Sequence, residues 1–170
     1  MVATDKDIER DRYERRAAAA LEDVKALPVL GAAGIEAEWR RPYVRFEELV
    51  RGLVRPEDSV LDLCCGDGQF SFVAAESGAR ITGLDVSAAS LALAGRRCPE
   101  ELHARTDWRE GDCEQLPFET NTFDGVVCAG GLSYGEWIPV LDELSRVLRP
   151  GGWFVAVDSY NHNPVYRLNR

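Results

Sequence analysis

The chain has 170 residues and a formal net charge of −9, and it is 45% hydrophobic and 29% charged. This length suits one domain with a substantial core, and the composition is that of a globular protein. Nucleic-acid affinity rests largely on Lys and Arg neutralising phosphates, so we expect no general nucleic-acid binding from an acidic chain. The apolar runs fall far short of the roughly 20 residues of a membrane span, and the N-terminus lacks a signal-peptide pattern. We therefore expect a cytoplasmic protein with no membrane partner.

The first part of the chain predicts two helices with a break between them. Residues 5–27 form a charged, alanine-rich helix candidate, and a run of small residues at 31–34 interrupts the pattern. A second helix candidate begins near Pro42, carries apolar residues at helical spacing and ends before Pro56. We treat residues 1–55 as one helical segment.

Strands and helices alternate in the rest of the chain. Strands are expected at 59–63, 80–84, 106–110, 123–128 and 153–157, and helices at about 69–77, 88–97 and 137–148. Ser87 is a good N-cap, and Arg-Pro-Gly-Gly at 149–152 is expected to close the last helix. The alternation predicts an α/β fold in residues 56–170, with a Rossmann-like, mostly parallel sheet and helices on both faces.

The most informative stretch covers residues 60–70, which read Val-Leu-Asp-Leu-Cys-Cys-Gly-Asp-Gly-Gln-Phe. An apolar run stops at a turn that contains Gly66 and Gly68, and a helical pattern follows. Such a turn presents bare backbone at the carboxyl end of a strand, where open parallel α/β sheets bind their ligands. Glycine is needed because a Cβ would keep the ligand away from the main chain. The stretch therefore predicts a nucleotide-like ligand.

Acidic residues at the ends of the next two strands support this interpretation. Asp85 lies 19 residues after Gly66, at a strand end where a carboxylate accepts hydrogen bonds from ribose hydroxyls. Asp112 follows the third strand and is positioned to meet an adenine edge. The pattern Gly66-x-Gly68-x-x-Ser71 is close to the dinucleotide fingerprint, so NAD has to be weighed against other adenosine ligands.

The five cysteines predict neither a disulfide framework nor a metal site. Their number is odd, and no Cys-x-x-Cys pair is present. Adjacent Cys64 and Cys65 would point to opposite sides of an extended chain, which makes a poor metal clip. We interpret them as small residues that fill tight space near a strand end.

Four segments in a fixed order carry a resemblance to a known family. They are 60–68, then 81–87 (Ile-Thr-Gly-Leu-Asp-Val-Ser), then 110–118 (Glu-Gly-Asp-Cys-Glu-Gln-Leu-Pro-Phe) with 121–128 (Asn-Thr-Phe-Asp-Gly-Val-Val-Cys), and finally 144–154 (Leu-Ser-Arg-Val-Leu-Arg-Pro-Gly-Gly-Trp-Phe). Together they resemble the class I S-adenosylmethionine-dependent methyltransferases, in particular the small-molecule group called type 11. A dehydrogenase would supply the first two segments but has no reason to supply the last two. The resemblance implies S-adenosylmethionine as cofactor and a small-molecule methyl acceptor.

The resemblance also implies cofactor-binding roles by position. The turn after the first strand should shape the pocket for the methionine part of the cofactor, and Cys64 stands where the family commonly has a glycine. Asp85 should hold the ribose hydroxyls, Val86 should lie against the adenine face, and Asp112 should bond the adenine amino group. The implied cofactor-binding residues are Asp62, Cys64, Gly66, Gly68, Asp85, Val86, Asp112 and Cys113, together with Ala129 and Gly130 beside the sulfonium.

Residues 1–55 are expected to form a helical lid over the cofactor, and Tyr13 and Trp39 are the aromatic residues that would close it. The alternative is that these aromatics only pack the helices onto the sheet. Methyl transfer from a sulfonium needs alignment, and an oxygen acceptor can also need a base. His162 is a candidate base because it follows the fifth strand, although it equally fits a polar loop. Tyr134 is a candidate for the lining of the acceptor pocket.

The chain departs from the resembled family at its C-terminal end. The usual fold has seven strands, whereas Arg170 ends the chain soon after the fifth, so the last two strands are apparently missing. An exposed edge strand invites pairing with another chain, which makes a homodimer a reasonable expectation. A non-catalytic cofactor-binding domain or partner subunit is the alternative function, and an NAD-dependent oxidoreductase is the third.

Overall fold

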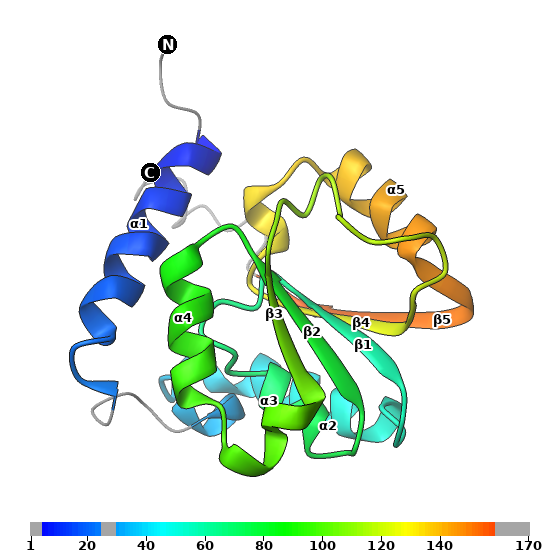
Figure 1. Ribbon diagram of the computed structural model, residues 1–170, viewed down its shortest axis with the longest axis horizontal. Coiled ribbons are helices and arrows are strands. Elements are labelled where there is room, and N and C mark those ends of the chain that lie inside the picture. Colours follow the sequence, from blue (N-terminus) through cyan, green and yellow to red (C-terminus); the bar gives the residue numbers. More distant parts are fainter. Residues whose placement is uncertain (1–4, 25–29, 159–170) are drawn as a thin grey trace.

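A five-stranded sheet organises the fold in the computed structural model, which describes residues 5–24 and 30–158. The strands are β1 Ser59–Leu63, β2 Arg80–Asp85, β3 Thr106–Glu110, β4 Phe123–Ala129 and β5 Leu148–Val157. Their order across the sheet is β3-β2-β1-β4-β5, and each neighbouring pair runs parallel (Figure 1). The α/β prediction is confirmed, and the strand that precedes the glycine turn lies at the centre of the sheet.

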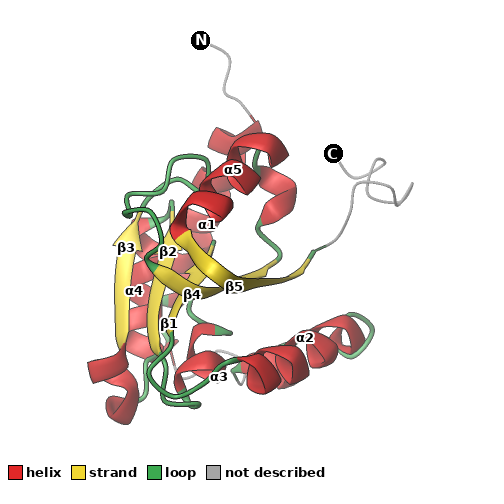
Figure 2. Cartoon of the chain, turned by 90° about the vertical axis from the view of Figure 1, so that its right-hand side faces the viewer, coloured by secondary structure: helices red, strands yellow, loops and turns green. Residues whose placement is uncertain are grey.

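Helices cover both faces of this sheet, as the alternating pattern predicted. The helices are α1 Asp5–Ala20, α2 Arg40–Leu53, α3 Ser71–Ala75, α4 Ala88–Arg97 and α5 Trp137–Val147, with short 3₁₀ turns η2 Gly31–Gly34, η3 Glu100–Arg105 and η4 Leu132–Tyr134. α2 and α3 lie on one side of the sheet and α5 lies on the other (Figure 2). α4 packs on β2 and β3, and α1 packs mainly on α4.

Successive residues of the central strands point into two hydrophobic cores, one on each face. Val60 contributes to the core beneath α2 and α3, whereas Leu61 and Leu63 contribute to the core beneath α5. All three side chains are fully buried, and burial of a side chain of this size contributes roughly 1.5–3 kcal/mol. A sheet covered on both faces is the usual environment of parallel strands.

Two tryptophans lie directly across from glycines on neighbouring strands. Gly83 of β2 pairs with Trp108 of β3, and Gly125 of β4 pairs with Trp153 of β5. A Cβ built on Gly83 would come within 2.5 Å of the Trp108 ring, and one on Gly125 within 2.2 Å of the Trp153 ring. Each indole fills the space that a larger residue would need, so packing requires both glycines.

The fifth strand begins earlier than the sequence predicted. Arg-Pro-Gly-Gly was expected to close the last helix, and α5 does end at Val147, but β5 begins at Leu148 rather than at residue 153. Leu148 pairs with Phe123, and the register then shifts before Gly125 pairs with Trp153. Residues 149–152 lie between these two pairings, at the register shift, and Gly151 has a left-handed φ of +82°, as suits a Pro-Gly-Gly segment.

Two helices are shorter than the sequence predicted. α1 ends at Ala20 rather than near residue 27, and the chain continues through a turn. α3 covers only Ser71–Ala75 instead of 69–77, because the residues before it belong to the turn that leaves β1. Ser87 does cap α4 as expected, since its hydroxyl accepts a hydrogen bond from the Ser90 N–H at 3.0 Å.

Candidate functional site

The turn between β1 and α3 contains three residues with a left-handed backbone. Their φ angles are +57° at Cys64, +55° at Gly66 and +79° at Gly68. A Cβ built on Gly66 would meet no atom of the described residues within 4 Å, so open space borders this position. A Cβ on Gly68 would instead come within 2.8 Å of Phe72 and 3.1 Å of Trp108. Gly66 therefore leaves room for a ligand, whereas Gly68 permits close packing of the turn.

Asp85 connects this turn to the end of β2. Its Oδ2 accepts a hydrogen bond from the Gly66 N–H, and its Oδ1 accepts one from the Ser87 N–H, both at 2.9 Å. Burial raises the pKa of Asp85, while the N–H groups of Ser87 and Gly66 act in the opposite direction. Each carboxylate oxygen can accept a further hydrogen bond, so Asp85 can bind hydroxyl donors while it clamps the two turns together.

Two further acids hold the turn in place. Asp62 is 2% exposed, and its Oδ2 accepts a hydrogen bond of 2.5 Å from the Ser71 hydroxyl at the start of α3. Burial raises the pKa of Asp62 to about 7. Asp67, between the two glycines, forms an ion pair with Arg97 in the last turn of α4. The turn is thus anchored to both neighbouring helices.

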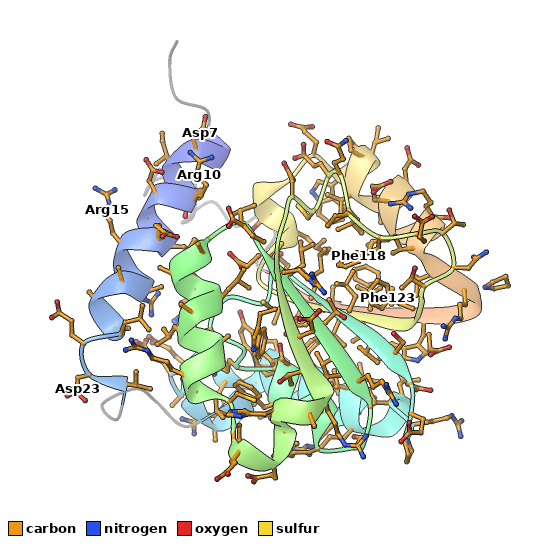
Figure 3. All side chains as sticks on the ribbon, viewed as in Figure 1. Asp7, Arg10, Arg15, Asp23, Phe118 and Phe123 are labelled. Carbon is orange, nitrogen blue, oxygen red and sulfur yellow. The ribbon has the colours of Figure 1, made fainter. Side chains whose placement is uncertain are left out.

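A pocket of about 340 Å³ lies between α1 and the carboxyl ends of β2 and β3. Its lining residues are Asp7, Arg10, Val86, Glu110, Gly111 and Asp112. Val86 and Asp112 are the two residues for which the resemblance implied adenine contacts, and Asp112 also accepts a hydrogen bond from the Glu114 N–H at 2.9 Å. Asp7 and Arg10 were missed by sequence reasoning, because no local pattern relates α1 to this edge of the sheet (Figure 3).

The turn after β1 and the turn after β4 are in close contact at Cys64 and Gly131. A Cβ built on Gly131 would lie 2.3 Å from the Cβ of Cys64 and 3.3 Å from the Sγ of Cys128. The Cys64 thiol is also within hydrogen-bonding reach of the thiols of Cys113 and Cys128. All five cysteines are free thiols, and those in this cluster fill tight space as the sequence analysis expected.

The end of β4 meets α2 through an aromatic side chain. Gly130, which follows Ala129, has a φ of +85°, and a Cβ built on it would lie 3.6 Å from the Tyr43 hydroxyl. Tyr43 stacks on Phe70, with the ring centroids 5.7 Å apart. Tyr43 was not singled out from the sequence, although it lies one helical turn before the buried Phe46 on the same helix.

The end of β5 carries an acid that sequence reasoning did not assign to the site. Asp158 Oδ2 accepts a hydrogen bond from the Ser133 N–H in η4 at 3.1 Å. Its Oδ1 is buried and has no hydrogen-bond partner within the described part of the chain. Tyr134, the predicted acceptor-pocket residue, follows Ser133 in η4, where its backbone alone is described. The predicted base His162 lies outside the described residues.

The two aromatic residues proposed to close a lid do not line the pocket. Tyr13 is partly buried on α1, with the Arg12 guanidinium carbon 5.9 Å from its ring centroid. Trp39 precedes α2 and is 56% exposed. α2 packs against α3 and β5 and buries Phe46 and Val50, so this helix forms part of one layer of the domain.

Comparison with known proteins assigns the chain to a family. A methyltransferase domain matches residues 60–152. The chain belongs to this methyltransferase domain family. A 2-phytyl-1,4-naphtoquinone methyltransferase from Synechococcus elongatus is 36% identical over 140 residues, which cover 79% of this chain and 58% of the relative. A demethylmenaquinone methyltransferase from Lactococcus lactis is 37% identical over 114 residues, which cover 64% of this chain and 45% of the relative.

Several solved structures share the fold of this chain. A protein from Pyrococcus horikoshii superposes with a TM-score of 0.66 at 29% identity, covering 79% of this chain and 64% of the other. A geranyl diphosphate methyltransferase in complex with GPP and sinefungin gives a TM-score of 0.67 at 26% identity, covering 90% and 65%. The [4+2]-cyclase SpnF gives 0.72 at 24% identity, which shows the fold alone. The chain spans a little over half the length of the first curated relative, and its described sheet is shorter than the usual seven strands.

Residues 5–24 and 30–158 contain neither a membrane-spanning helix nor a cluster of metal ligands. No helix there is both long and apolar enough to cross a membrane. No group of three or more His, Cys, Asp or Glu side chains there is arranged to hold a metal ion.

Proposed function

We propose that this chain binds S-adenosylmethionine along the carboxyl ends of its central strands and transfers the methyl group to a small-molecule acceptor. The observation that carries the proposal is the position of Asp85, whose carboxylate lies beside the open backbone at Gly66. Ribose hydroxyls are donors that suit this carboxylate, and the adenine amino group is a donor that suits Asp112 in the adjoining pocket. The site therefore fits an adenosine cofactor.

The family and its relatives favour S-adenosylmethionine over NAD. The matched domain is a methyltransferase domain, and both curated relatives described above are methyltransferases. When bound, S-adenosylmethionine supplies an electrophilic methyl group. The role of this chain is to hold the donor in line with the acceptor, which can contribute roughly 7–11 kcal/mol through effective molarity. Asp85 and Asp112 fix the nucleoside, and the backbone at Gly66, Ala129 and Gly130 borders the sulfur.

The acceptor would enter beside the ends of β4 and β5. An acceptor that loses a proton needs a base within hydrogen-bonding reach. Asp158 is a candidate for this base, because its buried Oδ1 accepts no hydrogen bond from any described group. Its Oδ2 accepts a hydrogen bond from the Ser133 N–H, which fixes the side chain beside η4. His162 and Tyr134 stay candidates for base and pocket lining on the strength of their sequence positions. Tyr43, whose hydroxyl approaches Gly130, joins them as a lining residue.

The acceptor class can be tested directly by methyl transfer. The two curated relatives are named for 2-phytyl-1,4-naphtoquinone and demethylmenaquinone, so reduced naphthoquinones head the panel, followed by phenols and isoprenoid diphosphates. Transfer of a tritiated methyl group from S-adenosylmethionine to one of these classes is the expected result. Cofactor binding without transfer to any member of a broad panel would favour the non-catalytic binding domain or partner subunit. The fold alone does not decide this, because a cyclase shares it.

Assembly and location complete the proposal. Within the described sheet, β5 pairs with β4 along one edge, and its other edge pairs with no described strand. Such an edge can pair with another copy, so we expect a homodimer. Sedimentation that shows only monomer at high concentration would contradict it. The five free thiols suit a reducing compartment, and recovery in the cytoplasmic fraction is the expected outcome of cell fractionation.

A further inference from the structure

Polar contacts help to attach α1 to the domain. Among its described side chains only Ala17 is buried, and Ile8 is 53% exposed. Glu14 makes the main connection, because its carboxylate accepts hydrogen bonds from the Ser87 hydroxyl at 2.6 Å and from the Ala89 N–H at 3.1 Å. A carboxylate at the N-terminal end of a helix such as α4 is also favoured by the helix dipole. Glu14 therefore fixes α1 beside the strand end that carries Asp85.

The same face of α1 continues to the pocket. Asp7, Arg10 and Glu14 are spaced at i, i+3 and i+7, so they lie along one side of the helix. While Glu14 binds the start of α4, Asp7 and Arg10 form the pocket wall opposite Val86 and Asp112. Arg10 is the one cationic residue among the residues that line this pocket, and it lies 3.5 Å from Asp7.

We propose that Arg10 is a specificity-determining residue for the adenine of the cofactor, held in place by the contact of Glu14 with the start of α4. This inference rests on the proposed binding of S-adenosylmethionine and deepens it. A guanidinium group stacks favourably on the face of a flat aromatic ring. With Val86 on the other wall and Asp112 at the ring edge, Arg10 would enclose the adenine from the side of α1.

Two roles of Arg10 can be distinguished by the ligands they serve: recognition of the adenine ring and binding of the methionine carboxylate. A carboxylate contact would serve only ligands that carry the amino-acid part of the cofactor. An adenine contact would serve every ligand that carries the base. Comparing S-adenosylhomocysteine with 5′-methylthioadenosine, which lacks the amino-acid part, therefore separates the two roles.

The test measures the calorimetric affinity of both ligands for the full chain and four variants: Arg10→Met, Arg15→Met, Glu14→Ala and the double variant Glu14→Ala/Arg10→Met. Arg10→Met keeps an unbranched apolar stem and removes the cation, and we expect the Kd of both ligands to rise roughly 3- to 30-fold. Arg15→Met is the matched control, because Arg15 is exposed and bonds only the Asp11 carbonyl of its own helix in the described contacts (Figure 3). Its Kd should stay within about twofold of the parent, as for a surface change. In a Glu14→Ala background, the effect of Arg10→Met should shrink to within about twofold, because the two residues act as one unit.

Each outcome decides a different point. Equal loss for both ligands with Arg10→Met, together with a silent Arg15→Met, supports the inference. Unchanged affinity of Arg10→Met in a parent protein that binds both ligands would overturn this inference and leave the proposed function intact. A loss confined to S-adenosylhomocysteine would also overturn it, in favour of carboxylate binding. Failure of the parent protein to bind either ligand would overturn the proposed function and this inference together.

Discussion

The contact between Cys64 and Gly131 allows a quantitative test of how the ligand turn is packed. Gly131 has a φ of −100°, which any residue adopts, so alanine meets no backbone obstacle there. Its Cβ would nevertheless lie 2.3 Å from the Cβ of Cys64. Overpacking of a close-packed site costs roughly 1–3 kcal/mol, and Gly131→Ala should lower the free energy of unfolding by that amount.

Cys64→Gly should remove this obstacle. The left-handed φ of +57° at Cys64 costs a non-glycine residue about 1–2 kcal/mol, and glycine relieves this strain. Relief is offset by the lost side-chain contacts and by the greater freedom of glycine in the unfolded chain, so the single change should stay within about 1 kcal/mol. In this background the nearest remaining contact of the new Cβ is the Cys128 Sγ, at 3.3 Å. The two changes should therefore show a coupling free energy of roughly 1–3 kcal/mol.

The coupling is measured by a double-mutant cycle. Urea unfolding followed by circular dichroism gives the free energy of unfolding of the parent, the two single variants and the double variant. Gly52→Ala is the matched control, because a Cβ on this α2 glycine would meet no described atom within 4 Å. It should raise stability by roughly 0.5–1 kcal/mol, the usual gain in a helix. Additive costs in the cycle, with no coupling beyond experimental error, would refute the packing argument.

Three further predictions concern the acidic residues Asp62, Asp85 and Asp158. Asp62 has a folded pKa of about 7 against an ordinary 3.8, so the folded state holds a proton that the unfolded state releases. The free energy of unfolding should therefore fall as the pH rises from about 4 through 7. The urea midpoints of Asp62→Asn should lack this decline, and parallel pH profiles of parent and variant would contradict the prediction. Asp85→Ala should weaken S-adenosylhomocysteine binding by about 1–3 kcal/mol in calorimetry, and an unchanged affinity would remove Asp85 from the site. Asp158→Asn should lower kcat by roughly tenfold or more and leave the affinity for S-adenosylhomocysteine unchanged. A kcat equal to that of the parent would exclude Asp158 as the base.

Much of the fold followed from local signals in the sequence. Each apolar run between turn residues became a strand, and parallel strands bring their carboxyl ends to one edge. For this reason Gly66 and Asp85, 19 residues apart, lie in direct contact. The early start of β5 was missed because the pairing of Leu148 with Phe123 decides it, and such a pairing leaves no mark in the local composition.

The missed parts of the site depend on contacts between distant segments. Glu14 and Ser87 are 73 residues apart, and the apolar residues of α1 do not indicate that a carboxylate on this helix bonds the start of α4. The role of Gly131 could not be read from its conformation, since it depends on the side chain of Cys64. Asp158 follows a strand as many structural acids do, and only its buried, unbonded Oδ1 distinguishes it among the described residues.

The central claim is that the pocket and turn beside Asp85 bind S-adenosylmethionine. Titration calorimetry of the full chain with S-adenosylmethionine, S-adenosylhomocysteine and NAD tests it most directly. We expect both adenosyl sulfur compounds to bind at one site per chain and NAD to show no saturable heat. Saturable binding of NAD, with no binding of either sulfur compound, would contradict the account.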